Sequence, residues 1–261
     1  MELELDIIPA SLKEQYLSEF GEFIKEDFDK LVDSELSTEN FSFYTSVSAV
    51  SSSKIEGEHV ELDSYIKHKR FGIEYQTDYT RKIDDLYEAY LFAQNNLLDE
   101  KSLLKAHALI TKHILKKHQR GKIRTSNMFV ITNNGKIEYV AASPNIVKSE
   151  MVRFFKDLDT LLNACFSFEE DLFYASLLHL VFVKIHPFDD GNGRTARLLE
   201  KWYIAQKWGS NAWFVQSEKN YYDKHNTYYN NIRLLGLEYD GLNYNKAMPF
   251  LKMLPESIIN R

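Results

Sequence analysis

The residues best suited to do chemistry lie together in the stretch HPFDDGNGRTAR, residues 186–197. Gly191 and Gly193 stand where a helical pattern begins, and a helix start leaves N–H groups unpaired and carries partial positive charge. Glycines let an anion approach those N–H groups closely. Arg194 and Arg197 are three residues apart, so we expect both to project from one face of the first turn. Two guanidinium groups beside a glycine-lined helix start predict a polyphosphate site.

Two other residues of the stretch suit phosphate chemistry. Asp190 would repel a bare phosphate, but a carboxylate often shares a Mg²⁺ ion with phosphate oxygens. His186 precedes it by four residues, and a neutral histidine can accept a proton from a hydroxyl group. Taken singly, His186 is typical of a helix C-cap, Asp190 of an N-cap, and two arginines of a solvated helix face. Their combination favours a nucleotide–Mg²⁺ site with a general base.

The elements that must position these residues are mostly helical. Apolar spacing predicts helices over 12–33, 83–98, 103–115, 146–162 and 195–208, and two more near 221–234 and 246–254. The segment 41–55 is short, polar and Ser-rich, and we interpret it as a further helix. Leu172–Ile185 is apolar all round, which predicts a buried central helix. Ser167 and Glu170 form a capping box at its start, and Pro187 predicts its end at His186. The runs 128–131 and 137–140 flank Asn134-Gly135, which predicts a β-hairpin.

The 186–197 stretch resembles the signature of Fic-domain proteins, His-x-Phe-x-Asp/Glu-Gly-Asn-Gly-Arg-x-x-Arg. The matching positions are His186, Phe188, Asp190, Gly191, Asn192, Gly193, Arg194 and Arg197. The segments GKIRTSNMFV and YVAASP are similar to the chain that enters and leaves a flap in that family. The resemblance covers roughly residues 80–235. It implies a mainly α Fic fold, a helical bundle with the active-site loop between two core helices and a small β-hairpin flap.

The resemblance also implies an activity, the transfer of AMP from ATP to a Ser, Thr or Tyr hydroxyl group of a target protein or of the protein itself. His186 would deprotonate the hydroxyl group, and Asp190 would hold Mg²⁺. Strand addition to the flap would hold the target backbone. Arg194 and Arg197 would orient the β- and γ-phosphates. The α- and β-phosphates would lie in an anion nest formed by Gly191, Asn192 and Gly193. Phe188 would pack in the core. Tyr228 and Tyr229 resemble a tyrosine pair of the family, with aromatic core packing as the open alternative.

A second motif, SSKIEG, resembles the inhibitory pattern Ser/Thr-x-x-x-Glu-Gly/Asn of Fic proteins through Ser52, Glu56 and Gly57. It implies that Glu56 pairs with Arg197 and occupies the guanidinium group meant for the γ-phosphate. The open alternative is an exposed glutamate before a glycine helix end. On this interpretation residues 1–75 are an N-terminal helical region that includes the inhibitory helix, and residues 76–261 are the catalytic core with C-terminal helices.

Several other functions fit parts of the pattern. An NAD-binding oxidoreductase would fit Gly191-x-Gly193-x-x-Ala196, which matches a loose dinucleotide fingerprint, but no strand directly precedes it and no βαβ alternation follows. A metal hydrolase could use His179 and His186, but no third ligand is evident. A binding module without activity would not need the intact signature. Within the Fic family, the same site could remove AMP, with Glu56 orienting a water, or could transfer another phosphate-containing group.

Composition sets the remaining expectations. The net charge is −6, and no basic face indicates a nucleic-acid partner. The longest apolar run is too short to span a bilayer, and the sequence MELELDIIPA lacks the features of a signal peptide. A single cysteine, Cys165, fits a reducing compartment. We therefore expect a cytoplasmic protein without membrane partners, and its oligomeric state stays open.

Overall fold

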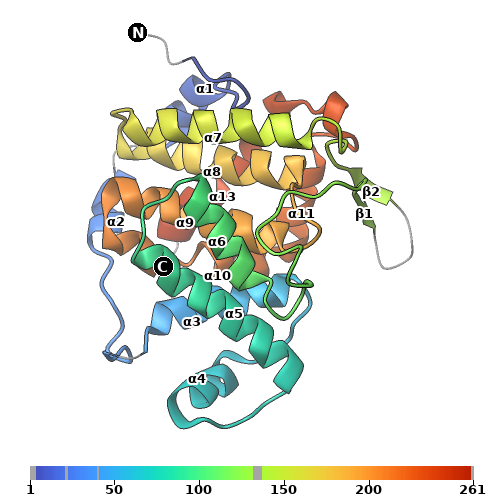
Figure 1. Cartoon of the computed structure of the whole chain (residues 1–261). Helices are drawn as coiled ribbons and strands as arrows, with labels where there is room; N and C mark the ends of the chain where they lie inside the picture. The colour runs from blue at the N-terminus through green and yellow to red at the C-terminus, as the bar shows by residue number, and fades with distance from the viewer. Residues whose placement is uncertain (1–3, 21–22, 40, 132–136, 260–261) are drawn as a thin grey trace.

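The protein is described by a computed structural model that covers residues 4–20, 23–39, 41–131 and 137–259, and it is mainly helical (Figure 1). The two strands are β1 (Phe129–Ile131) and β2 (Ile137–Val140). The helices are α1 (Lys13–Glu19), α2 (Phe23–Asp29), α3 (Phe43–Ile55), α4 (Leu62–Phe71), α5 (Thr77–Gln94), α6 (Glu100–Ile110), α7 (Val147–Asn163), α8 (Phe168–Ile185), α9 (Asn192–Trp208), α10 (Ser217–Asp223), α11 (His225–Arg233), α12 (Met248–Leu251) and α13 (Met253–Ile259), with short 3₁₀ turns at η1 (Ser210–Phe214), η2 (Tyr239–Gly241) and η3 (Tyr244–Lys246).

Helix α8 is the centre of the molecule. It packs along α9 and is covered by α7, and nearly all of its side chains are buried. The predicted capping box is present, because the Ser167 hydroxyl accepts from the Glu170 N–H and the Glu170 carboxylate accepts from the Ser167 N–H. The helix ends at Ile185, as predicted from Pro187, and His186 is its C-cap. The expected buried central helix is therefore confirmed.

Some expected helices are interrupted. The segment 12–33 forms α1 and α2 because Phe20 takes an extended backbone conformation that ends α1. The segment 221–234 spans α10 and α11, which are separated at Lys224, and the segment 246–254 spans α12 and α13. Helix α4 was not predicted, since Tyr65 is its one buried residue and its apolar pattern is correspondingly weak.

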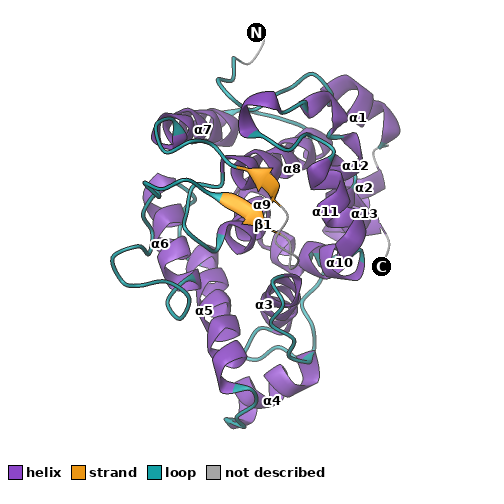
Figure 2. Ribbon diagram, turned by 90° about the vertical axis from the view of Figure 1, so that its right-hand side faces the viewer, coloured by secondary structure: helices purple, strands orange, loops and turns teal. Residues whose placement is uncertain are grey.

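The hairpin pairs β1 and β2 antiparallel, with Phe129 opposite Val140 and Val130 opposite Tyr139. The predicted turn at Asn134-Gly135 lies outside the described residues. On its other side β2 is tied to the segment after α11, because the Val140 N–H donates to the Leu237 carbonyl at 2.8 Å. Figure 2 shows the hairpin in front of α8 and α9.

Helix α3, which carries the SSKIEG motif at its end, is built into the bundle. It lies between α5 and α10 (Figure 2), and its Ser-rich face is buried. The Ser42 hydroxyl caps its start by accepting from the Thr45 N–H. The division at residue 75 stays a prediction. Across the described part of the chain, none of the helices has the length and apolarity needed to cross a bilayer.

Candidate active site

The loop between α8 and α9 is anchored by two stacked rings, those of Phe188 and His107. Phe188 is fully buried and stacks on His107, with ring centroids 3.6 Å apart. His107 Nδ1 accepts from the Gly121 N–H at 2.9 Å, so Nε2 carries the proton and donates to the Asp190 carbonyl at 2.9 Å. Burial lowers the pKa of His107 to about 4, which keeps this ring neutral near pH 7. A packing role for Phe188 agrees with this geometry.

Two more polar side chains fix the loop backbone. The Asn192 amide accepts from the Phe188 N–H and donates to the Phe188 carbonyl, both at 2.9 Å. The side chain of Asn192 therefore closes the loop and leaves only its backbone N–H for an anion. Arg124 donates from Nε to the His186 carbonyl at 2.7 Å, and its backbone N–H donates to the Pro187 carbonyl at 2.9 Å. Sequence reasoning gave Arg124 and His107 no role, because both act through contacts distant in sequence.

His186 has one ring nitrogen that can accept a proton. Its Nδ1 lies 3.1 Å from the Val183 carbonyl, and because a carbonyl can only accept, Nδ1 carries the proton. Nε2 is then the unprotonated nitrogen that can take a proton. Burial lowers the pKa of His186, so the neutral form is favoured.

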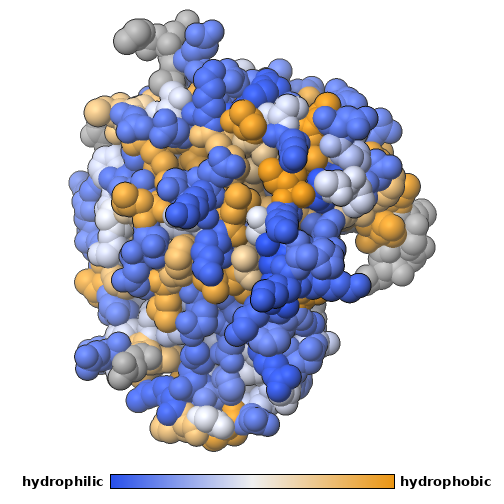
Figure 3. Space-filling view, viewed as in Figure 1, coloured by the Kyte–Doolittle hydropathy of each residue, from blue (hydrophilic) through white to orange (hydrophobic). Residues whose placement is uncertain are grey.

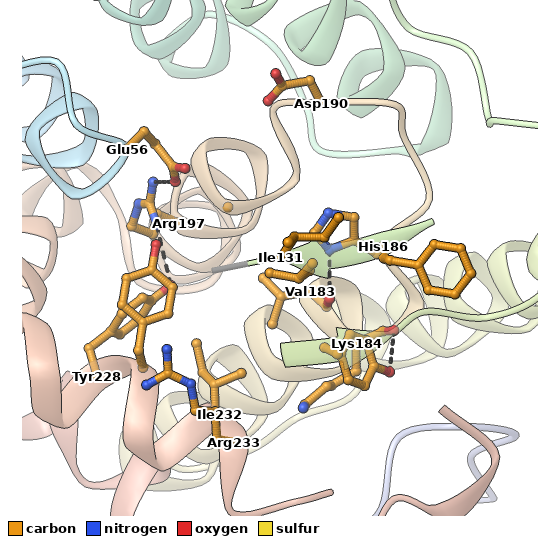
Figure 4. A pocket seen from close by; sticks show the side chains of 15 residues that line it. Glu56, Ile131, Val183, Lys184, His186, Asp190, Arg197, Tyr228, Ile232 and Arg233 are labelled. Atoms are coloured by element: carbon orange, nitrogen blue, oxygen red, sulfur yellow. Dashed lines mark hydrogen bonds and ion pairs between the residues drawn. The ribbon is translucent and has the colours of Figure 1, made fainter. Parts of the chain in front are cut away.

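A cavity of about 470 Å³ lies between this loop, the hairpin and α11. Figure 4 shows Arg197 and Glu56 on one side of it and His186 on the other. Of the predicted site residues, Glu56, His186, Asp190, Gly193 and Arg197 line the cavity. The other lining residues are Phe129, Val130, Ile131, Tyr139, Val183, Lys184, Tyr228, Tyr229, Ile232 and Arg233.

The glycines of the motif make room at the start of α9. Gly191 has a φ of +79°, and a Cβ there would lie 2.7 Å from Thr111 Cγ2. A Cβ at Gly193 would lie 2.6 Å from Glu56 Oε1 and 3.1 Å from Arg197 Nη1. The space beside Gly193 thus holds an anionic group next to a guanidinium group, and in this structure that anion is the Glu56 carboxylate.

Arg197 is almost fully buried and has four hydrogen bonds. Nη2 donates to Glu56 Oε1 at 2.6 Å and to the Ser52 carbonyl at 3.1 Å, and Nε donates to the Ser52 hydroxyl at 2.8 Å. Nη1 donates to the Tyr228 hydroxyl at 3.3 Å. The structure therefore brings Ser52, Glu56 and Arg197 together across 141 residues of sequence. Gly57 follows with a φ of +89°, a conformation that favours glycine.

Arg194 is placed differently from Arg197 and is absent from the cavity lining. Its Nη2 donates to Glu58 Oε1 at 2.7 Å, and both side chains are buried. Burial raises the pKa of Glu58, although the Arg194 guanidinium opposes this. Within the described ranges, Glu58 Oε2 and Arg194 Nε have no hydrogen-bond partner. Glu58 was missed in the sequence, where it follows the SSKIEG motif directly. The carboxylates of Glu56 and Glu58 thus engage both arginines of the signature.

Of the two carboxylates that line the cavity, Glu56 is paired with Arg197, so Asp190 is the one that could hold a divalent cation. Asp190 lines the cavity, and its side chain is 54% exposed. Among the residues that the structure describes, no three His, Cys, Asp or Glu side chains gather as a metal site. A single exposed carboxylate fits Mg²⁺, which takes phosphate oxygens and water as its other ligands. His179 does not converge with His186, because it is fully buried and bonded to Glu200.

Sequence comparison agrees with this site. Residues 97–204 match the model of the Fic/DOC family. The protein adenylyltransferase Fic of Culex quinquefasciatus is 34% identical over 112 residues, which are 42% of this chain and 20% of that protein. The protein adenylyltransferase fic-1 of Caenorhabditis briggsae is 34% identical over 104 residues, 36% of this chain and 18% of that protein. The alignments thus span about a fifth of the length of these relatives.

Solved structures give the same fold. A Fic family protein from Desulfovibrio desulfuricans G20 superposes with a TM-score of 0.69 at 18% identity, over 100% of this chain and 75% of that one. Fic-1 (residues 134–508) from C. elegans has a TM-score of 0.69 at 16% identity, over 96% of this chain and 71% of that one. The matched residues 97–204 contain the loop, the hairpin and both signature arginines. Residues 97–204 of this chain therefore match the Fic/DOC family model, and the whole chain has the fold of the solved Fic proteins.

Proposed function

We propose that the protein transfers AMP from ATP to a hydroxyl side chain of a target protein. One observation carries this proposal: His186, Asp190, Gly193 and Arg197 line a single cavity beneath the hairpin. A base, a carboxylate, a glycine-lined helix start and a guanidinium group are the parts that nucleotidyl transfer needs. The names of the two adenylyltransferase relatives support the same chemistry.

In this proposal the residues divide the work as follows. The phosphates lie at the start of α9, with Arg197 on the terminal phosphates. Asp190 would hold Mg²⁺, which when bound neutralises charge on the phosphate groups. His186 Nε2 takes the proton as the target hydroxyl oxygen forms a bond to the α-phosphorus. The bond from the α-phosphorus to the bridging oxygen breaks, and pyrophosphate leaves with the electron pair.

The hairpin is the proposed docking element for the target. The outer side of β2 is bridged to residues 237–238, so within the described residues β1 has the unpaired edge. Its apolar side chains are unusually exposed, with Phe129 at 44% and Ile131 at 58%. Figure 3 shows apolar surface at the right-hand edge of the molecule, where the hairpin lies. An extended target segment could add to this edge, which would supply affinity with little sequence specificity.

Glu56 is the proposed brake on this reaction. Its carboxylate takes the place beside Gly193 and Arg197 that a phosphate would need. Burial opposes its ionisation, but the Arg197 and Arg194 guanidinium groups hold the pKa of Glu56 below its usual value. The carboxylate is thus charged at physiological pH and excludes a second anion from Arg197. Release of Glu56 would be the step that permits productive ATP binding.

The substitution Glu56→Gly tests the function and the brake together. With radiolabelled ATP and Mg²⁺, we expect incorporation of label into the protein itself or into lysate proteins to rise at least about tenfold, the factor that loss of about 1.4 kcal/mol of inhibition gives. Mass spectrometry would confirm AMP on a hydroxyl side chain. Glu61→Gly is the matched control, because Glu61 is exposed and pairs only with Lys54 among the described residues.

The outcomes separate the two claims. His186→Ala in the Glu56→Gly background should abolish transfer while ATP still binds, since Arg197 and the start of α9 are unchanged. If the Glu56→Gly protein is no more active than the natural chain, the brake assignment is wrong. If it binds ATP but labels no protein, the proposed transfer to proteins is wrong.

A further inference from the structure

A chain of buried polar groups reaches Arg197 from behind the cavity. Tyr221 donates its hydroxyl proton to the Glu200 carboxylate at 2.9 Å. His179 Nδ1 lies 2.8 Å from Glu200 Oε2, and its Nε2 lies 3.0 Å from the Tyr228 hydroxyl. That hydroxyl accepts from Arg197 Nη1 at 3.3 Å. All five side chains are at most 1% exposed, so each hydrogen bond is costly to break.

The donor and acceptor of each hydrogen bond in this series follow from the chemistry of the groups. A guanidinium group only donates, so the Tyr228 oxygen must accept from Arg197. The Tyr228 proton is then available to His179 Nε2, which must be unprotonated to receive it. His179 Nδ1 consequently carries a proton and donates to Glu200. Donation thus runs from Arg197 through Tyr228 and His179 to Glu200, and every proton in the series has an acceptor.

The hydrogen-bond partners of Arg197 come from two different elements. Three of the four hydrogen bonds of Arg197 go to Ser52 and Glu56, at the end of α3. The fourth goes to Tyr228 on α11, which does not belong to the inhibitory segment. When Glu56 leaves Arg197, the Tyr228 contact is independent of that change.

We propose that Tyr228 and His179 are positioning residues, which hold the Arg197 guanidinium group in the orientation that binds the terminal phosphates of the nucleotide. This inference rests on the proposed function, in which Arg197 exchanges Glu56 for phosphate. Burial raises the pKa of Tyr228 to about 12, although Arg197 opposes the shift, so the hydroxyl remains a donor to His179 over the working pH range. Tyr228 also packs against Tyr221 and Phe250, so the test must separate orientation of Arg197 from core packing.

The test compares two nucleotides that differ in the phosphates Arg197 would bind. In the Glu56→Gly background, Tyr228→Phe keeps the ring and removes the hydroxyl group. We expect the Kd for MgATP to rise about tenfold or more, the usual effect of losing a hydrogen bond to a charged group. The Kd for AMP, which has no terminal phosphates, should change less than about twofold. Displacement of a fluorescent adenine nucleotide measures both, and steady-state kinetics should show the change in KM for ATP more than in kcat.

Matched variants protect the conclusion from a folding defect. Tyr221→Phe removes a hydroxyl group from the same Glu200 carboxylate but leaves the path from His179 to Arg197 intact, so the ratio of ATP to AMP affinity should not change. His179→Leu should lower that ratio as Tyr228→Phe does, whereas His179→Gln offers an amide oxygen to Tyr228 and should restore part of it. A loss of stability alone would lower the affinities for ATP and AMP by the same factor.

The failures are distinguishable. A Glu56→Gly parent that binds no ATP contradicts the proposed function. A parent that binds ATP, with an unchanged ATP-to-AMP ratio in Tyr228→Phe or an equal loss in Tyr221→Phe, overturns the positioning role alone.

Discussion

His186 has a backbone conformation that a histidine rarely adopts, with a φ of +53°. A left-handed residue with a side chain costs roughly 1–2 kcal/mol, and here the cost is met by contacts around it. Its own N–H donates to the Phe182 carbonyl at 3.0 Å, and its carbonyl accepts from Arg124. Such strain is typical of functional residues. The conformation ends α8 and turns the chain into the loop, while the ring remains at the cavity.

The lowered pKa of His186 predicts the pH dependence of transfer. Under the proposed function His186 is the base and acts only when neutral, so transfer would be lost as the pH falls through its pKa. Because burial lowers that pKa below its ordinary value, we expect the acidic limb of kcat/KM for the Glu56→Gly protein to lie below about pH 6.5. A pH profile measured at low ATP checks this. An acidic limb clearly above pH 6.5 would show that His186 is not the base or that its pKa is not lowered.

Several residues that line the cavity could be predicted from the sequence, but the residues that hold them in place could not. His186, Asp190, Gly193 and Arg197 follow from residue types within one short stretch, and Glu56 follows from a second motif. Glu58, His107 and Arg124 act through partners between 62 and 136 residues away. Their types and spacing carry no local signal, because histidines and arginines in amphipathic segments are usually solvated.

Among the elements, α3 has two polar attachments to the α9 helix that differ in character. Near its middle, the Ser48 hydroxyl accepts from Lys201 Nζ at 2.7 Å and donates to Glu218 at 3.0 Å. Lys201 and Glu218 form a buried ion pair at 2.5 Å, which is joined by the Tyr90 hydroxyl. At its end, α3 contributes Ser52 and Glu56 to Arg197. The first attachment is structural, so we expect release of Glu56 to involve the end of α3 and to leave the rest of the helix in place.

The buried ion pair behind α3 predicts a large stability effect. Lys201→Met leaves the Glu218 carboxylate buried without its cation, and the free energy of unfolding should fall by about 3–5 kcal/mol. The double variant Lys201→Met with Glu218→Gln should recover part of this loss. Lys219→Met, on the same helix as Glu218 but in an exposed pair with Asp223, should cost less than about 1 kcal/mol. Chemical denaturation measures all three, and equal losses for Lys201→Met and Lys219→Met would contradict this account.

How well an element could be predicted depended on its burial. The central helix α8 is apolar on all sides and has both a capping box and a proline stop, so several local signals agree on its bounds. The segments 12–33 and 221–234 have apolar residues at helical spacing and yet break, because short helices are stabilised by packing rather than by their own pattern. The hydrogen bond between the Val140 N–H and the Leu237 carbonyl could not be predicted, because it joins backbone groups and does not depend on side-chain types.

At the scale of the whole molecule, competition between Glu56 and nucleotide should appear in thermal stability. A ligand at about 100 times its Kd stabilises the folded state by about 2.7 kcal/mol, which for a chain of this size corresponds to roughly 5–10 °C in Tm. We expect MgATP to raise the Tm of the Glu56→Gly protein by this amount and that of the natural chain by clearly less at the same ATP. Scanning fluorimetry with and without MgATP measures it. Equal shifts in the two proteins would show that Glu56 does not compete with ATP.

The Glu56 carboxylate beside Gly193 is joined to its binding place through the backbone, and this has a consequence for how the protein would respond to its surroundings. A tethered group keeps the same effective molarity at any dilution of the protein. At Arg197 the Glu56 carboxylate, at a constant effective molarity, would therefore compete with nucleotide phosphates whose concentration varies. Under the proposed function, the active fraction would follow the supply of nucleotide and be indifferent to how much of the protein is present.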